Sequence, residues 1–371
     1  MQEPLSTMLL LESENKYPDC LWMNLEAIPL QSGSTAQPQL DLYLTLQFNE
    51  QWEPLLGGRF KFGLKGGELK LKLENGEILS PSPQLNGSFC QITTPDSLKN
   101  PVWVFEVGKE ETILKGQLQN CKLGTLNVKA SPCRVEALFE VSKQDVYLTE
   151  AEGLWRHDIS PNKHAAIERK LVISLWEAEL TPYLSWVQLC YDCSPNSVEK
   201  RSEAQASLSL SALEDVIKHL SEAKSNDFLE LAKIAALDPK IDFAGGNLRG
   251  TTLSQIELSG ANLCHANLRG ADLTDADLSE ANLRSAKLSG ADLSGAYLEN
   301  ADLSDTDLHR ASLALANLGG ANLSGANLNE VNLSNANLSG AKVNETRFGN
   351  NPGLSEEMKL NLKQRGAIFQ E

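Results

Sequence analysis

The sequence predicts a mainly β protein with two parts: a β-rich, sandwich-like N-terminal domain and a C-terminal solenoid. Three observations support this fold class. Residues 241–350 repeat in blocks of five, with Leu, Phe or Val at the third place of every block. Short runs in which apolar and polar residues alternate fill much of the chain before residue 190. All six Trp also precede residue 190, so the two parts must have cores of different composition.

Residues 1–193 form the predicted β-rich domain. Gly66-Gly67 and Asn75-Gly76 indicate turns between its first alternating runs, because Gly and Asn tolerate the backbone conformations that turns need. Many short strands with little helix favour an antiparallel sandwich or a jelly-roll-like domain. The runs that we expect to be strands are 42–48, 60–64, 69–73, 102–107, 117–128, 135–141 and 170–176.

A linker and a helical segment precede the repeat. Residues 194–209 are rich in Ser, Glu, Lys and Asn, which is typical of a linker. Residues 210–240 contain two helical patterns, and Pro239 ends the second. An open solenoid exposes apolar core and unpaired strand edges at its ends, so we expect residues 210–240 to cap the first coil.

The repeat at 241–350 keeps a strict period of five over 22 blocks. Helical burial recurs about every 3.6 residues and strand burial every 2, so neither element fits, and the chain must turn regularly. The first and third residues of each block are mostly small or apolar and should point inward. Asn, Asp, Ser and Gly, which suit corners, fill the outward places. The predicted core includes Leu263, Leu268, Leu283, Leu288, Leu303 and Leu323.

Individual blocks of the repeat carry a family resemblance. Ala-Asn-Leu-Arg-Gly at 266–270, Ala-Asp-Leu-Ser-Gly at 291–295 and Ala-Asn-Leu-Ser-Gly at 321–325 resemble the pentapeptide repeat family, A(D/N)LXX, and its cyanobacterial members in particular. The resemblance covers 241–350 and does not extend to the N-terminal domain. It implies a right-handed quadrilateral β-helix with four blocks per coil, about five and a half coils and a length of about 26 Å.

Residues 351–371 predict a C-terminal cap. Asn351-Pro352-Gly353 breaks the pattern of the repeat, and Ser355 is a suitable N-cap for a following helix. Gly366 is placed to end that helix. We expect residues 367–369 to fold over the last coil.

Composition narrows the class of protein. A net charge of −16 argues against direct binding to nucleic acid, which needs concentrated basic residues. No stretch approaches the roughly 18 apolar residues of a membrane span, and the N-terminus lacks the basic flank of a signal peptide. Seven scattered Cys suit a reducing compartment better than a disulfide framework. We therefore expect a cytoplasmic protein without a membrane segment.

Residues with catalytic or metal-binding chemistry are sparse. Cys190 and Cys193 form a lone CxxC, whereas a structural zinc site needs a second pair of ligands. Separate strand-end cysteines are the favoured interpretation over zinc or a redox pair. His157 and His164 flank a polar loop without a spaced nucleophile or carboxylate partner. We expect no enzyme activity, no cofactor and no metal.

Charged residues of the repeat separate by face if four blocks make one coil, because residues twenty apart then stack. One face is basic and the next two are acidic. Chance clustering on a solvated surface is one interpretation. The other is an oriented docking face for a protein partner, with two unusually large or apolar outward residues as anchors. The candidate partner-binding residues are Arg249, Arg269, Lys287, His309, Arg310, Tyr297 and Leu315.

The leading functional expectation is a non-catalytic scaffold or adaptor, whose two parts bind different, unidentified protein partners. The resemblance implies one alternative, because some pentapeptide repeat proteins mimic duplex DNA and bind DNA gyrase through a long, strongly acidic rod. The short repeat here holds 13 acidic and 7 basic residues, which disfavours that role. A second alternative is a small-ligand or enzymatic site in the N-terminal domain, lined by Trp103, Trp155, Trp176 and Trp186.

Overall fold

The computed structural model describes residues 8–30, 37–79, 90–93, 100–108, 111–156, 158–193 and 210–370. The expected linker at 194–209 and His157 lie outside the described residues. The chain divides into two compact units. The first comprises Met1–Leu154 with Ser174–Leu208, and the second comprises Trp155–Ile173 with Ser209–Glu371. Residues 155–173, which we expected in the N-terminal domain, thus group with the repeat.

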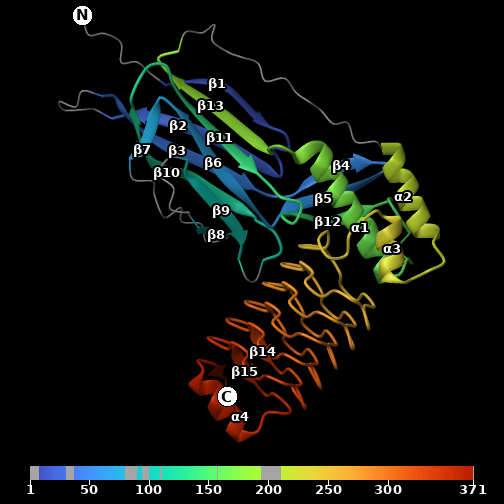
Figure 1. Cartoon of the computed structure of the whole chain (residues 1–371). Helices are drawn as coiled ribbons and strands as arrows, with labels where there is room; N and C mark the ends of the chain where they lie inside the picture. The colour runs from blue at the N-terminus through green and yellow to red at the C-terminus, as the bar shows by residue number, and fades with distance from the viewer. Residues whose placement is uncertain are drawn as a thin grey trace, which may run out of the picture. The chain divides into compact units, whose positions relative to one another are not determined.

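The first unit is built from antiparallel strands in three sheets (Figure 1). The six-stranded sheet has the order β1-β13-β11-β6-β9-β8, the four-stranded sheet β2-β3-β10-β7, and the three-stranded sheet β12-β5-β4. The strands are β1 (Met8–Asn15), β2 (Leu21–Pro29), β3 (Gln39–Phe48), β4 (Gln51–Leu55), β5 (Gly58–Leu64), β6 (Gly66–Glu74), β7 (Gly76–Leu79), β8 (Cys90–Thr93), β9 (Val102–Val107), β10 (Gly116–Val128), β11 (Cys133–Glu140), β12 (Val146–Glu152) and β13 (Ser185–Tyr191).

Three aromatic rings join the six-stranded and four-stranded sheets. Phe48 of β3 lies 5.9 Å from Phe105 of β9 and 5.7 Å from Phe139 of β11, measured between ring centroids. The Phe105 and Phe139 centroids are 5.5 Å apart. All three rings are at most 2% exposed. The two sheets therefore share one apolar core, to which such aromatic pairs add about 0.5–1.5 kcal/mol each beyond simple burial.

The run 170–176, expected to be a strand, belongs mostly to a helix, α1 (Pro161–Leu175), which continues into a π-helical turn, η1 (Trp176–Leu180). The hydroxyl of Ser160 accepts a hydrogen bond from the N–H of Lys163 at 3.4 Å and so caps the helix start. The strand prediction was wrong because a mostly apolar run of seven residues is too short to distinguish the two-residue period of a strand from the 3.6-residue period of a helix. Buried side chains at four-residue spacing are Ile167, Leu171 and Leu175.

Two further helices, α2 (Leu210–Glu222) and α3 (Phe228–Ile234), precede the repeat. The Asp227 carboxylate caps α3 by accepting a hydrogen bond from the N–H of Glu230 at 2.9 Å. The Phe228 ring packs on the ring of Phe243 in the first block, with centroids 4.9 Å apart. Helix α3 therefore covers the apolar start of the repeat.

Polar side chains of α1 bind the edge of the first coil. The Asn162 amide donates to the carbonyl of Thr252 at 3.0 Å and accepts from its N–H at 2.8 Å. Glu168 accepts from the side chain of Asn247 at 3.1 Å, and Arg169 donates to the carbonyl of Asp242. Side chains thus take the place that a neighbouring strand would fill at this edge.

The repeat forms stacked coils of twenty residues, seen in Figure 1 as rungs from yellow to red. Parallel bridges join Asn267 to Lys287 and Lys287 to Asp307, and the N–H of Leu288 donates to the carbonyl of Asp307 at 2.7 Å. Each coil therefore contains four blocks. The residues predicted as core are at most 1% exposed: Leu263, Leu268, Leu283, Leu288, Leu303 and Leu323.

The fifth residue of each block forms a corner in the left-handed backbone region, as at Gly270 (φ 65°) and Asn300 (φ 57°). Glycine and asparagine adopt this conformation more easily than other residues, which explains their frequency there. Leu315 has φ 61° and is the only apolar corner residue in 241–350, a range that the structure describes throughout.

The C-terminal tail covers the last coil. The Ser355 hydroxyl caps α4 by accepting a hydrogen bond from the N–H of Met358 at 3.2 Å, as the sequence predicts. The Phe369 ring stacks on Phe348, with centroids 5.1 Å apart. A short parallel sheet in the order β14-β15-β16 therefore extends the stack by one rung. The elements at this end are β14 (Asn327–Asn329), β15 (Arg347–Gly349), α4 (Glu356–Gln364) and β16 (Ile368–Phe369).

Candidate partner-binding surfaces

The basic face of the solenoid consists of the blocks that begin at 246, 266, 286, 306, 326 and 346. Arg249 and Arg269 are exposed and occupy equivalent places in adjacent coils. Lys287 is half-buried and stacks between Asn267 and Asp307. Stacked coils are about 4.8 Å apart, so the two arginines place their charges side by side.

The far end of the basic face is partly neutralised. The guanidinium of Arg310 lies 2.8 Å from the carboxylate of Glu330, which is twenty residues further on and therefore one coil away. This contact raises the pKa of Arg310 and lowers the pKa of Glu330, and both side chains stay largely exposed. His309 contacts the carbonyl of Asn329 through Nδ1 at 3.1 Å. Arg249 and Arg269 therefore define the more strongly basic end.

Tyr297 and Leu315 do not lie on the basic face. Tyr297 is 54% exposed, and parallel bridges join it to Asp277 in the preceding coil and to Asn317 in the next. Leu315 is 66% exposed and ends the block before the one that contains Asn317. Both belong to the two faces whose charged residues are acidic. The structure therefore divides the seven candidate residues between two surfaces.

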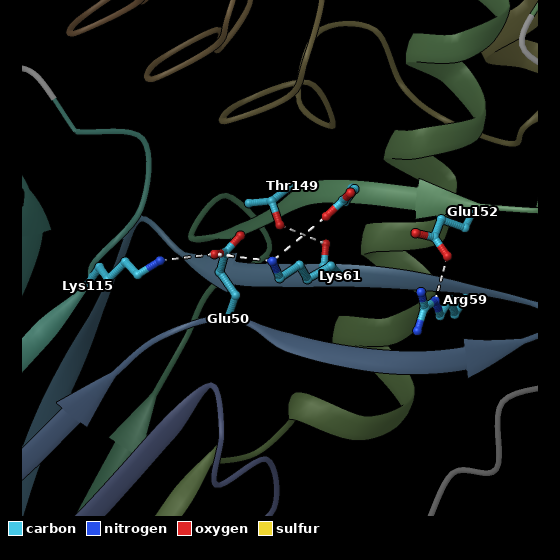
Figure 2. Close-up of polar contacts among 7 residues, drawn as sticks. Glu50, Arg59, Lys61, Lys115, Thr149 and Glu152 are labelled. Carbon is cyan, nitrogen blue, oxygen red and sulfur yellow. Dashed lines mark hydrogen bonds and ion pairs between the residues drawn. The ribbon is translucent and has the colours of Figure 1, made fainter.

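A network of charged side chains lies beside the three-stranded sheet of the first unit (Figure 2). The Glu50 carboxylate is 3.4 Å from Nζ of Lys115 and 3.6 Å from Nζ of Lys61, which also lies 3.8 Å from Glu150. Burial alone would raise the pKa of Glu50. Hydrogen bonds from Thr149 and Lys115, together with the two lysine charges, outweigh burial and lower it. The arrangement keeps Glu50 ionised.

Arg59 extends this polar strip along β5. Its guanidinium lies 2.6 Å from the carboxylate of Glu152, as Figure 2 shows, and 4.3 Å from the ring centroid of Trp52. Water screens an exposed ion pair of this kind, so it contributes little to stability. The network places opposite charges together and keeps Glu50 and Glu152 ionised, which suits a solvated sheet surface. Basic residues at alternate positions of one strand, Arg59 and Lys61, were the sequence signal for the network, and our sequence-based predictions did not use it.

The four Trp residues considered for a ligand site have separate packing partners. Trp103 is fully buried in the core of the first unit. Trp176 donates from Nε1 to the carbonyl of Val141 at 2.8 Å, and Trp186 donates to Glu136 at 2.6 Å. Trp155 belongs to the second unit, where its ring meets the ring of His164.

The cysteines and histidines differ in part from expectation. Cys190 and Cys193 form a disulfide, whereas we expected separate thiols. The reason is that the end of β13 brings their Cα atoms to 5.9 Å, within the range for a disulfide. His164 lies on α1 rather than in a loop. Burial lowers its pKa, and its Nδ1 is 3.3 Å from the carboxylate of Glu168.

Among the residues that the structure describes, no group of three or more His, Cys, Asp or Glu side chains is placed to hold a metal ion. Within the same residues, no helix has the length and apolar character needed to cross a membrane.

Known proteins resemble the repeat. Residues 241–279, 276–313 and 311–350 match a family described as pentapeptide repeats. Rfr23, a pentapeptide repeat protein from the cyanobacterium Cyanothece 51142, is 39% identical over 26% of this chain and 63% of its own, with a TM-score of 0.24. The pentapeptide repeat protein alr5209 from Nostoc is 35% identical over 28% of this chain and 84% of its own, with a TM-score of 0.25.

HetL, a pentapeptide repeat protein of Nostoc involved in heterocyst differentiation regulation, is 35% identical over 28% of this chain and 57% of its own, with a TM-score of 0.15. The chain thus spans less than two thirds of Rfr23 and of HetL. None of the curated proteins that were compared matches it. Residues 1–240 fall outside the family match. Through residues 241–350, the chain belongs to the pentapeptide repeat family.

Proposed function

We propose that this protein is a non-catalytic interaction scaffold whose solenoid presents its basic face to an acidic protein partner. The observation that carries the proposal is the register of Arg249 and Arg269, which project from adjacent hydrogen-bonded coils. A surface held in this way loses little conformational freedom on binding, so less of the contact energy is spent on ordering it.

The different tasks of inward and outward residues within each block support the proposed role as a scaffold. Inward Leu and Ala residues form the core, and backbone hydrogen bonds hold the coils, so the outward residues are available for recognition. A right-handed quadrilateral coil belongs to this proposal. So do a cytoplasmic location and a second partner for the β-rich domain. The proposed domain boundaries are 1–193, 194–209, 210–240, 241–350 and 351–371, except that residues 155–173 group with the repeat.

Charge reversal of the basic face tests the proposal. Arg249→Glu with Arg269→Glu should reduce recovery of the partner in affinity purification with mass spectrometry. The loss should be greatest at low salt, because exposed charges are screened beyond about 10 Å at 0.1 M. Both residues are exposed, so the melting temperature should change little.

A matched control reverses charge on the acidic faces. Glu257→Lys with Glu280→Lys alters two exposed residues there and should leave recovery of the same partner intact. Unchanged recovery with the arginine variant at every salt concentration would show that the basic face does not bind, and the β-rich domain would become the binding element.

A further inference from the structure

Leu315 occupies a position that disfavours it in two ways. Its φ of 61° lies in the left-handed region, which residues with a Cβ adopt reluctantly. Its apolar side chain is also 66% exposed. The equivalent corners one coil away are Gly295 and Asn335, both suited to this conformation. The same φ recurs at every corner of the repeat, so the unusual feature of Leu315 is an exposed apolar side chain at a corner that glycine or asparagine suits better. Folding of the coil does not explain the leucine.

Tyr297 lies next to Leu315 on the surface. Gly295 is one coil from Leu315 and two residues before Tyr297, and its N–H donates to the carbonyl of Ala314 at 2.8 Å. With one coil spacing and at most the rise of two extended residues between them, the Cα atoms of Tyr297 and Leu315 are no more than about 8 Å apart. Both side chains are more than half exposed. We refer to Tyr297 and Leu315 together as the Tyr–Leu patch.

Negative charge lies on the N-terminal side of the Tyr–Leu patch. The two faces that carry the Tyr–Leu patch comprise the ten-residue segments 251–260, 271–280, 291–300, 311–320 and 331–340, all of which the structure describes. These segments contain no Lys, Arg or His. Their acidic residues are Glu257, Asp272, Asp275, Asp277, Glu280, Asp292 and Glu299.

The carboxylates nearest the patch belong to the coil of Tyr297 and to the coil before it. Asp277 bridges to Tyr297 from the preceding coil, and Glu299 is two residues beyond Tyr297 in the same block. Asp275 occupies the corner one coil before Gly295, and its Oδ1 lies where a side chain on Gly295 would begin. A ligand that covers the two apolar side chains therefore also meets three carboxylates.

We propose that the Tyr–Leu patch binds a basic segment of a protein partner. An aliphatic or aromatic side chain of that segment packs on Tyr297 and Leu315, and its Lys or Arg side chains approach Asp275, Asp277 and Glu299. The apolar pair supplies the anchor, and charge complementarity selects a basic ligand and speeds its association. This surface is separate from the basic face, so the inference does not depend on the role proposed for Arg249 and Arg269.

The test replaces each residue by one that the repeat itself uses at the equivalent place. Leu315→Gly copies Gly295, and Tyr297→Asn copies Asn317. Because glycine suits the left-handed corner, the double variant should melt at the same temperature as the native chain or slightly higher. The probe is a fluorescein-labelled peptide, Lys-Lys-Leu-Lys-Trp-Lys-Lys, titrated with the full chain and followed by fluorescence anisotropy. We expect the double variant to bind it about tenfold more weakly.

Two controls define the outcome. A peptide with Gly in place of Leu and Trp should bind the native chain and the double variant with the same low affinity. Arg249→Glu with Arg269→Glu should leave the peptide affinity within about twofold, which separates this surface from the basic face. Equal affinity of the native chain and the double variant for the first peptide would overturn the inference. So would sedimentation showing that the patch holds a second copy of the chain, released by the double variant.

Discussion

Replacing an inward leucine by alanine tests the architecture of the coil most directly. Leu288 is fully buried, and the equivalent residues of the adjacent coils, Leu268 and Leu308, are fully buried too. The backbone on both sides is fixed, since the N–H of Leu288 donates to Asp307 at 2.7 Å and the N–H of Lys287 donates to Ala266 at 2.9 Å. The site therefore has little freedom to collapse around a smaller side chain.

The expected cost of Leu288→Ala follows from that rigidity. Buried Leu→Ala substitutions destabilise proteins by about 2–5 kcal/mol, and the cost rises with the volume of the cavity that remains. We expect about 4 kcal/mol, near the upper end of the range. Leu315→Ala is the same chemical change at a residue that is 66% exposed, and it should alter the free energy of unfolding by less than about 0.5 kcal/mol.

Urea denaturation followed by far-ultraviolet circular dichroism measures the two free energies, and hydrogen exchange with mass spectrometry locates the change. Faster exchange should be confined to coils near Leu288, because each repeat contacts mainly its neighbours. A cost below about 1 kcal/mol for Leu288→Ala, or equal costs for the two variants, would show that the third residue of the block is not part of a tightly packed core.

Two further predictions concern the ends of the fold. Asn162→Ala leaves the N–H and carbonyl of Thr252 without their side-chain partner and should lower the free energy of unfolding by about 2 kcal/mol. Hydrogen exchange in the first coil should become faster. Unchanged exchange at Thr252 would show that α1 does not cap this coil. The pKa of Glu50 is lower in the folded state than the value of about 4.3 in the unfolded chain. Ionised Glu50 therefore stabilises the fold above about pH 4.3, and this stabilisation is lost as the pH falls through the folded-state pKa. Glu50→Gln should therefore lower stability at pH 7 and flatten the stability profile below about pH 4.3; parallel profiles in urea titrations would contradict this.

The repeat was predictable because its physics is local and periodic. An inward Leu every fifth residue, with Gly, Asn or Asp at corners, is visible in any single block, and the positive φ values at those corners confirm the reason for the composition. The cap at Ser355 was predictable for the same reason, since an N-cap depends on only a few neighbouring residues. In both cases the signal and the structure lie within one short segment.

Other features depend on contacts that no short segment contains. Helix α1 was missed although Ser160-Pro161 marks its start, because the apolar run after it also fits a strand. Strand β1 pairs with β13, so Met8 faces Tyr191 across 182 intervening residues, and alternation alone cannot specify such a partner. The neighbours of Tyr297 likewise follow from twenty-residue stacking, and the five-residue period does not state how many blocks make a coil.

Departures from the repeat pattern are therefore more informative about function than the acidic charge itself. Asp272 and Asp292 each accept a hydrogen bond from the backbone N–H two residues on, at 3.1 and 3.0 Å, so they help to hold the corner as well as carry charge. Asn262 makes the same contact with Cys264. Much of the acidic composition thus coincides with a structural task that asparagine performs equally well. No such task accounts for an exposed leucine at a left-handed corner, and this contrast makes the Tyr–Leu patch the sharper place to look for a partner.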